Sequence, residues 1–210
     1  MKISTVVFVL FLMLSTQLFG QKIDTKREFT STKEALQNPE KVIRLDLSNQ
    51  EVNLSNEEWS KFVNLESLKL KNDHLKEIPL GITTLKSLKS IDLSGNDFKI
   101  LPNEFSNLLN LEELLLNDEK NIDLSQSLSV LVKLPTLKSL HLENDNLSSL
   151  PAELLLFKDL ESLNLRKNLF KEIPNLEGLD HLQYLDMKNN NIKSALQDIQ
   201  NINFGVKINF

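Results

Sequence analysis

The side chains in this sequence most able to do acid–base or metal chemistry are three histidines and several neighbouring acidic residues. His74, His141 and His181 stand in different local contexts, and none belongs to an H-E-x-x-H zinc motif. Pairs such as Glu112–Glu113 and Asp118–Glu119 have the residue types of an acid–base pair, but the chain is acidic throughout, which favours solvated surface carboxylates. Nucleophile motifs of the G-x-S-x-G type and phosphate-binding glycine loops are also missing. We therefore predict no catalytic residue, no cofactor and no metal site.

Composition narrows the class of protein and of partner. Apolar residues make up 40% of the chain and charged residues 25%, which is typical of a folded globular protein. The formal charge of −5 argues against a nucleic-acid-binding protein, which usually carries a basic face. Cysteine is absent, so the sequence offers no thiol nucleophile, no zinc–thiolate site and no disulfide. Packing alone must then stabilise the fold.

The first twenty residues have the pattern of an export signal. Lys2 precedes a continuous apolar run at residues 6–14, polar residues follow at 15–17, and Gly20 offers a small residue for cleavage. We predict a signal peptide at residues 1–20, a secreted, periplasmic or cell-envelope location, and no membrane span after cleavage. An uncleaved anchor is the alternative, because residues 3–19 approach the roughly 20 residues that a bilayer requires.

The rest of the chain repeats the pattern L-x-x-L-x-L seven times. In the clearest unit, Leu88, Ile91 and Leu93 alternate with polar residues, which predicts a short strand buried on one face. A constant period in the twenties predicts a solenoid of stacked units. The units start, at spacings of 23, 23, 23, 26, 23 and 22 residues, at Val42, Leu65, Leu88, Leu111, Leu137, Leu160 and Leu182.

A polar residue follows each predicted strand at a turn whose backbone groups need partners. An amide side chain can donate and accept hydrogen bonds, whereas an ionised carboxylate only accepts, so we expect carboxylates to hold these turns less completely. The residues at this position are Gln50, Asp73, Asn96, Glu119, Asp145, Asn168 and Asn190.

The second half of four units begins with an apolar residue and a proline. Proline suits the first turn of a short helix, and apolar residues then recur at every third position, as in a tight helical turn that covers the core. We expect such a turn after each of Ile78–Pro79, Leu101–Pro102, Leu150–Pro151 and Ile173–Pro174.

These residues resemble the leucine-rich-repeat family, in the form with units of about 23 residues and the consensus LxxLxLxxNxLxxLP. The resemblance spans residues 42 to about 195. It implies an α/β leucine-rich-repeat solenoid, with a curved parallel sheet on the concave face and short helices or helical turns on the convex face. It also implies noncatalytic protein binding through the concave face, by analogy. Extracellular animal members usually carry cysteine-rich caps, so their absence points to an exported bacterial member.

The two ends of the solenoid need caps over the exposed core. The S-x-x-E pattern of Ser31 and Glu34 predicts a capping box and a cap helix at residues 31–38. Alternation at residues 206–210 predicts a closing strand, and the alternative is that a second copy or a partner strand pairs with its edge. The predicted divisions are an N-terminal segment at 21–41, repeats at 42–202 and the closing strand at 203–210.

The fourth unit breaks the pattern. The stretch from Leu116 to Ile122 lacks both the Asn and the Leu-Pro, and the unit is three residues longer than its neighbours. We expect the insertion to form a loop, and a loop that contributes to binding is the alternative.

The strand period also locates an exposed face. The residues between the inward-facing leucines should line up from unit to unit, at a spacing of about 4.8 Å between strands. In this column Asp46, Lys69 and Asp92 can form a charge ladder, which contributes little on an exposed face. The column comprises Asp46, Lys69, Asp92, Leu115, His141, Asn164 and Asp186.

Leu115 is an apolar residue in a polar column. Together with His141, Glu143, Arg166 and Tyr184 it is the predicted partner-binding patch, since Tyr and Arg are favoured at protein interfaces. The alternative is that a single exposed leucine is ordinary on a protein surface.

These observations predict an exported, noncatalytic and monomeric scaffold that binds a protein, with a glycan as the alternative ligand. If the N-terminal segment is not a signal, similar repeats point to an intracellular regulator of small GTPases or of signalling complexes. A third hypothesis is a substrate-holding module of an enzyme complex.

Overall fold

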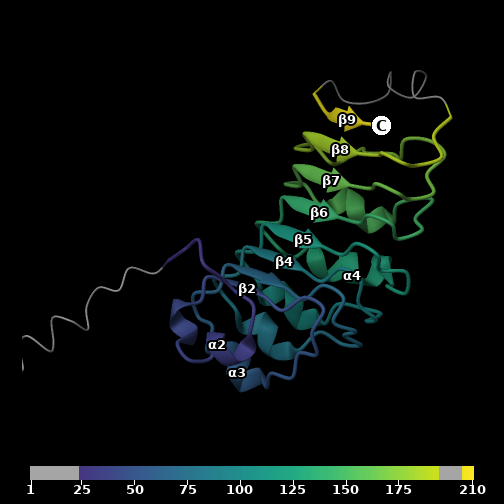
Figure 1. Ribbon diagram of the computed structural model, residues 1–210. Helices are drawn as coiled ribbons and strands as arrows, with labels where there is room; N and C mark the ends of the chain where they lie inside the picture. The colour runs from purple at the N-terminus through teal and green to yellow at the C-terminus, as the bar shows by residue number, and fades with distance from the viewer. Residues whose placement is uncertain (1–23, 194–204) are drawn as a thin grey trace, which may run out of the picture.

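The computed structural model describes residues 24–193 and 205–210, so the predicted signal at residues 1–20 lies outside the described residues. Within them, nine strands form one parallel sheet whose spatial order is the order of the chain. Figure 1 shows the strands stacked along one side of the coil and the helical segments along the other. This architecture confirms the predicted solenoid, with one strand more at the N-terminal end than the seven units and closing strand require.

The strands are short and evenly spaced. They are β1 (Glu28–Phe29), β2 (Arg44–Asp46), β3 (Ser67–Lys69), β4 (Ser90–Asp92), β5 (Glu113–Leu115), β6 (Ser139–His141), β7 (Ser162–Asn164), β8 (Tyr184–Asp186) and β9 (Lys207–Asn209). The helical segments are α2 (Thr32–Ala35), η1 (Pro39–Lys41), α3 (Asn56–Ser60), η2 (Leu80–Thr84), η3 (Asn103–Asn107), α4 (Leu124–Leu131) and η4 (Ala152–Leu156).

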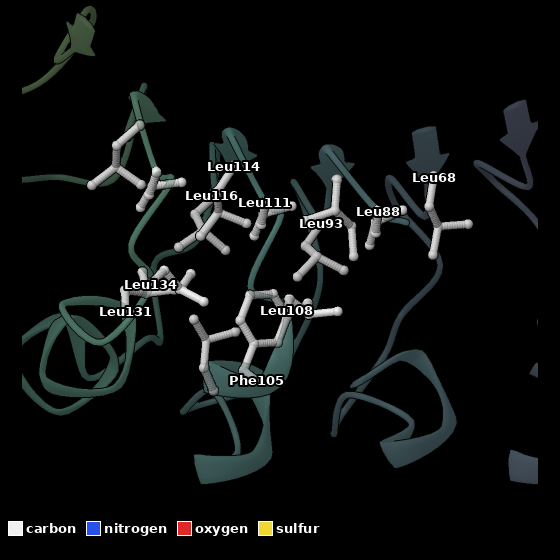
Figure 2. Close-up of a cluster of buried hydrophobic side chains, with 14 of the residues drawn as sticks. Leu68, Leu88, Leu93, Phe105, Leu108, Leu111, Leu114, Leu116, Leu131 and Leu134 are labelled. Carbon is white, nitrogen blue, oxygen red and sulfur yellow. The ribbon is translucent and has the colours of Figure 1, made fainter. Parts of the chain in front are cut away.

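The core lies between the sheet and the helical side. In β2 to β7 the middle residue is buried and its two neighbours are half-buried, as the alternation predicts. Leu68, Ile91 and Leu114 are register partners, so equivalent leucine-type residues stack along the whole coil. Figure 2 shows the strand residues Leu68 and Leu114 on the sheet side and Phe105 and Leu108 of the third unit's return half on the helical side, inside a single continuous core.

Proline starts three of the four expected helical turns. The segments η2, η3 and η4 begin directly after Pro79, Pro102 and Pro151, and their first inward residues are buried. The prediction of a helical turn after Pro174 is wrong. There the Asn175 side chain accepts a hydrogen bond from the backbone N–H of Glu177 (2.9 Å), and this local turn replaces the helical one.

Residues 116–122 of the fourth unit form turns without a helix, as the predicted loop requires, but the unit's return half is an α-helix, α4 (Leu124–Leu131), longer than the five-residue η2, η3 and η4. Asp123 caps the N-terminus of α4 by accepting a hydrogen bond from the N–H of Gln126 (2.9 Å). Leu124, Leu128 and Leu131 are buried, a spacing of four and three residues that suits an α-helix. The insertion therefore lengthens the return half on the helical side and leaves the sheet register intact.

The N-terminal cap differs from its prediction. Helix α2 is present but spans only Thr32–Ala35, and the Ser31 side chain makes no capping hydrogen bond. Glu34 instead forms an ion pair with Arg27, which draws its carboxylate away from the helix N-terminus. The additional strand β1 pairs in parallel with β2 and so covers the first edge of the repeats.

A capping box does occur one unit later, at α3. The Ser55 hydroxyl accepts from the N–H of Glu58 (3.2 Å), and the Glu58 carboxylate accepts from the N–H of Ser55 (2.9 Å). The box fixes a helix that places Trp59 in the core with no exposed surface, against Phe62 at 6.1 Å between ring centroids. This helix stands where the first unit lacks the Leu-Pro pair.

The helix α3 lies directly against η2. The N–H of Gly81 donates to the Asn56 side chain (2.7 Å), and a Cβ at position 81 would lie 2.7 Å from both the Asn56 Cα and the Trp59 Cβ. Only glycine permits this approach.

Among the described residues, no helix is long and apolar enough to cross a membrane.

Candidate functional site

The exposed side chains of the sheet form one continuous surface, which we call the inner face. It consists of the first and third residues of strands β2 to β8 and the residue two places after each strand. The register places Asp92, Leu115 and His141 side by side on β4, β5 and β6, which confirms the predicted column. Tyr184 lies in the neighbouring column, next to Ser162.

His141 is the centre of a polar cluster beside Leu115. Its Nε2 lies 3.1 Å from the Ser139 hydroxyl and 3.5 Å from the Glu113 carboxylate, while Asn164 Nδ2 lies 3.4 Å from its Nδ1. The hydrogen bond with His141 lowers the pKa of Glu113, and a hydrogen bond from Ser90 lowers it further against the effect of burial. His74 and His181 are surface residues, whereas the His141 side chain is only 24% exposed.

This cluster does not have the geometry of a catalytic triad. In a triad the serine and the acid bind opposite nitrogens of the histidine ring, so that the acid orients the ring and the other nitrogen accepts the serine proton. Here Ser139 and Glu113 approach the same nitrogen, Nε2. The arrangement fixes the orientation of the ring on the inner face without activating the hydroxyl.

Glu143 and Arg166 lie on the next column, beside this cluster. The Glu143 carboxylate accepts hydrogen bonds from Lys167 Nζ (2.9 Å) and Asn164 Nδ2 (3.4 Å). Burial raises the pKa of Glu143, but these hydrogen bonds and the charges of Lys167 and Arg166 outweigh it, so the pKa is lowered overall. The carboxylate is thus held as an anion at a fixed position.

Tyr184 stands apart from the other predicted residues. Strand β7 separates it from His141, and its hydroxyl donates to Asp186 (3.1 Å) and accepts from Asn209 (3.2 Å). The structure therefore brings Leu115, His141, Glu143 and Arg166 to adjacent positions and places Tyr184 at the far edge of the same face.

The inner face also contains a hollow of about 370 Å³ between β2 and β5. Lys69, on its wall, forms ion pairs with Glu28 (2.9 Å) and Asp46 (3.2 Å), so the charge ladder runs from Lys69 through Asp46 to strand β1 rather than to Asp92 as predicted. Lys89 pairs with Glu66 (3.1 Å). The hollow is lined by Arg44, Glu66, Ser67, Lys69, Lys89, Ser90, Asp92, Glu113 and Leu115.

Behind the inner face, the turn residues form a hydrogen-bonded ladder. Asn168 accepts from the backbone N–H groups of Asp145 and Leu147 and donates to backbone carbonyls, among them that of Leu142. Gln50 is not part of the buried ladder: it is exposed, and its side chain donates to the carbonyl of Thr30.

The carboxylates in the ladder have fewer bonds than the asparagines. Asp73, Glu119 and Asp145 each accept a backbone N–H from the preceding unit, and each has a second buried oxygen without a hydrogen-bond partner in the described residues. This confirms the expectation that carboxylates hold the turns less completely. Within the described residues, no group of three or more acidic or histidine side chains has a metal-binding arrangement.

Comparison with known proteins identifies the repeats. Residues 135–192 match the family model described as leucine rich repeat. The fold is a leucine-rich-repeat solenoid. A comparison with curated proteins found no match.

Solved structures of other solenoids superpose on most of this chain. A leucine-rich-repeat protein of Leptospira interrogans is 25% identical, covers 87% of the chain and has a TM-score of 0.56. Human 5T4, or trophoblast glycoprotein, is 24% identical to this chain and has a TM-score of 0.66. The match covers 81% of this chain and 69% of the 5T4 chain, and it supports the fold alone. The structure of TLR13 with a single-stranded RNA is 28% identical over 78% of the chain (TM-score 0.59). The solenoid spans 58% of the Leptospira chain and 23% of the TLR13 chain.

Sequence reasoning missed the hollow on the inner face. Ser67 and Ser90 occupy the column in which Arg44 and Glu113 have longer side chains, and their small size leaves the space open. The signal was present as a run of serines at equivalent positions of successive units, but the depth of the hollow depends on the ion pairs that its longer neighbours form.

Proposed function

We propose that the protein is an exported, noncatalytic scaffold that binds another protein through the inner face. The observation that carries this proposal is the position of Leu115: a partly exposed apolar side chain between the hollow and the His141–Glu143 cluster. Protein interfaces have an apolar centre and a polar rim, and Arg and Tyr are common in them. Arg166 and Tyr184 supply these two side chains on one side of Leu115.

The likeness to other solenoids supports a macromolecular partner. One similar structure, at 18% identity and a TM-score of 0.61, is that of the Toll–Spatzle complex of Drosophila, and another is that of TLR13 bound to RNA. We favour a protein over an RNA partner because the formal charge of this chain is −5, and RNA-binding surfaces are basic. A glycan is the alternative ligand of the same face.

Export rests on the sequence pattern of residues 1–20 and on the likeness to a bacterial leucine-rich-repeat protein. N-terminal sequencing of the protein from its native source tests it. We expect a mature chain that starts near Gln21. A chain that starts at residue 1 or 2 would contradict a cleaved signal; recovery of that chain from the cytoplasm rather than from a membrane fraction would then contradict export and favour the intracellular regulator over the uncleaved anchor.

Replacing Leu115 and Tyr184 with alanine should weaken the binding of the protein partner without unfolding the coil. We expect the dissociation constant of the partner captured from the envelope or medium to rise at least about tenfold, mainly through Leu115, because truncation of a central interface residue costs about 2 kcal/mol or more. Binding to the immobilised full chain measures it, and circular dichroism checks the fold.

Leu109→Ala is the matched control. Leu109 is 54% exposed and lies after η3 on the return side of the coil, away from the inner face. Its variant should bind like the wild type. Equal binding by the wild type and the Leu115→Ala/Tyr184→Ala variant would remove the proposed patch.

A further inference from the structure

The ladder behind the inner face requires both an acceptor and a donor at each position. The Asn96 Oδ1 accepts from the N–H groups of Asp73 (3.1 Å) and Leu75 (3.0 Å), and its Nδ2 donates to the carbonyls of Leu70 (2.8 Å) and Leu93 (2.6 Å). Asn168 repeats this arrangement three units later: its Oδ1 accepts two N–H groups and its Nδ2 donates to carbonyls. One oxygen and one nitrogen of each amide thus satisfy the turns of two successive units.

Glu119 and Asp145 occupy the two ladder positions between these asparagines. Glu119 accepts from the N–H of Asn96 (2.8 Å), and Asp145 accepts from the N–H of Glu119 (2.7 Å). Each bond reproduces one of the two N–H bonds that an asparagine oxygen accepts at this position. The second carboxyl oxygens, Glu119 Oε2 and Asp145 Oδ2, are buried and have no hydrogen-bond partner in the described residues. The two residues are only 2% and 8% exposed.

A deprotonated carboxylate cannot fill the donor half. Its oxygens carry only lone pairs, and a buried charged oxygen that no donor reaches is costly. A protonated carboxyl group has one O–H and one accepting oxygen, the same pair of functions as the asparagine amide. We infer that Glu119 and Asp145 are protonated carboxylic acids in the folded protein, and that their protons act as a latch joining the third, fourth and fifth units.

The charges around the pair favour the protonated form. Besides burial, three negative charges raise the pKa of Glu119. They are Asp97 of the preceding unit, Asp118 next to Glu119 in the chain, and Asp145 of the following unit. Asp118 and Glu143 act in the same sense on Asp145. The ladder neighbours on either side, Asn96 and Asn168, are neutral.

Burial is the main cause of the shifts. It raises the pKa of Glu119 from 4.5 to about 8 and the pKa of Asp145 from 3.8 to about 7, with the neighbouring carboxylates adding to it. A raised folded-state pKa means that the folded protein binds more protons than the unfolded chain above about pH 4. The stability from these groups is complete below their unfolded pKa values and is lost as the pH rises through about 7 and 8.

The latch lies directly behind the centre of the proposed binding face. Leu115 and Glu119 belong to the same strand and turn, and Asn117 between them accepts a hydrogen bond from the N–H of Glu143 (2.9 Å). Opening of the latch would therefore loosen the fourth unit where it supports Leu115. This inference concerns the fold and stands whether or not the inner face binds a partner.

The pH dependence of thermal unfolding tests the latch on the full chain. Between about pH 5.5 and pH 8.5 we expect the unfolding midpoint of the wild type to fall by more than about 4 °C. The variant Glu119→Gln/Asp145→Asn has permanent amide donors at both positions, so its unfolding midpoint should fall by less than half as much as that of the wild type over the same pH range. The matched control Glu104→Gln/Asp180→Asn removes two exposed carboxylates and should behave like the wild type.

Carboxyl-carbon NMR of the wild type tests the same inference without any substitution. We expect the Glu119 and Asp145 carboxyl signals to titrate with midpoints near 8 and 7. Midpoints near the ordinary values of about 4 would overturn the latch. An equal pH dependence of the midpoint in the wild type and the Glu119→Gln/Asp145→Asn variant would also overturn it.

Discussion

Replacing Asn168 with alanine is expected to lower the free energy of unfolding by about 4 kcal/mol, because several buried backbone groups lose their partners at once and each costs about 1–3 kcal/mol. The substitution leaves the N–H groups of Asp145 and Leu147 without an acceptor and the carbonyls of Leu142 and Leu165 without this donor. Denaturant unfolding followed by circular dichroism measures the change.

Asn107→Ala is the control for this prediction. Asn107 is exposed at the end of η3, and its loss should change the free energy of unfolding by less than about 0.5 kcal/mol. The loss of unfolding free energy for Asn168→Asp should lie between those for Asn168→Ala and Asn107→Ala, because the aspartate keeps the acceptor and supplies a donor only when protonated. A loss below about 1 kcal/mol for Asn168→Ala would show that the ladder does not hold the units together.

Replacing Phe105 with alanine should cost about 4 kcal/mol for a different reason, the cavity left in the core. Phe105 is fully buried at the centre of η3, and Figure 2 shows its ring among leucines of the third and fourth units. Because each unit contacts mainly its neighbours, the cavity should loosen the middle of the solenoid. The same unfolding experiment measures the loss.

The exposed Leu109 provides the comparison for Phe105. Leu109→Ala removes an apolar side chain four residues away that is 54% exposed, so its effect should stay within about 0.5 kcal/mol. If both substitutions cost the same, the core would not be packed around the return half of the third unit.

The sheet was predictable because its period is simple. Residues such as Ile91 and Leu93 alternate with polar neighbours, and a constant spacing of units forces equivalent residues into one register. The helical side was harder to predict. Asp123 and the leucines of α4 contain the signals of an α-helix, but the missing Leu-Pro favoured a loop. The Ser31 pattern failed because Glu34 pairs with Arg27, a competition between side chains that local sequence does not reveal.

The residues that share each column of the candidate site could be predicted from the sequence, but the hollow on its surface could not. The strand period alone places Leu115 beside His141. The hollow depends on the conformations of Lys69 and Lys89, which are set by ion pairs with acids from other units. The latch was visible as carboxylates at asparagine positions, but only the structure shows that Glu119 and Asp145 are buried.

Site-directed photo-crosslinking tests the central claim, that the inner face around Leu115 contacts a protein. A photo-activatable residue is placed at position 115 in one variant and at position 109, on the return side of the coil, in another. After irradiation in the native envelope or medium, we expect the same protein to be crosslinked repeatedly at position 115 and not at position 109. Equal crosslinking at the two positions, or crosslinking at position 109 alone, would contradict binding through the inner face.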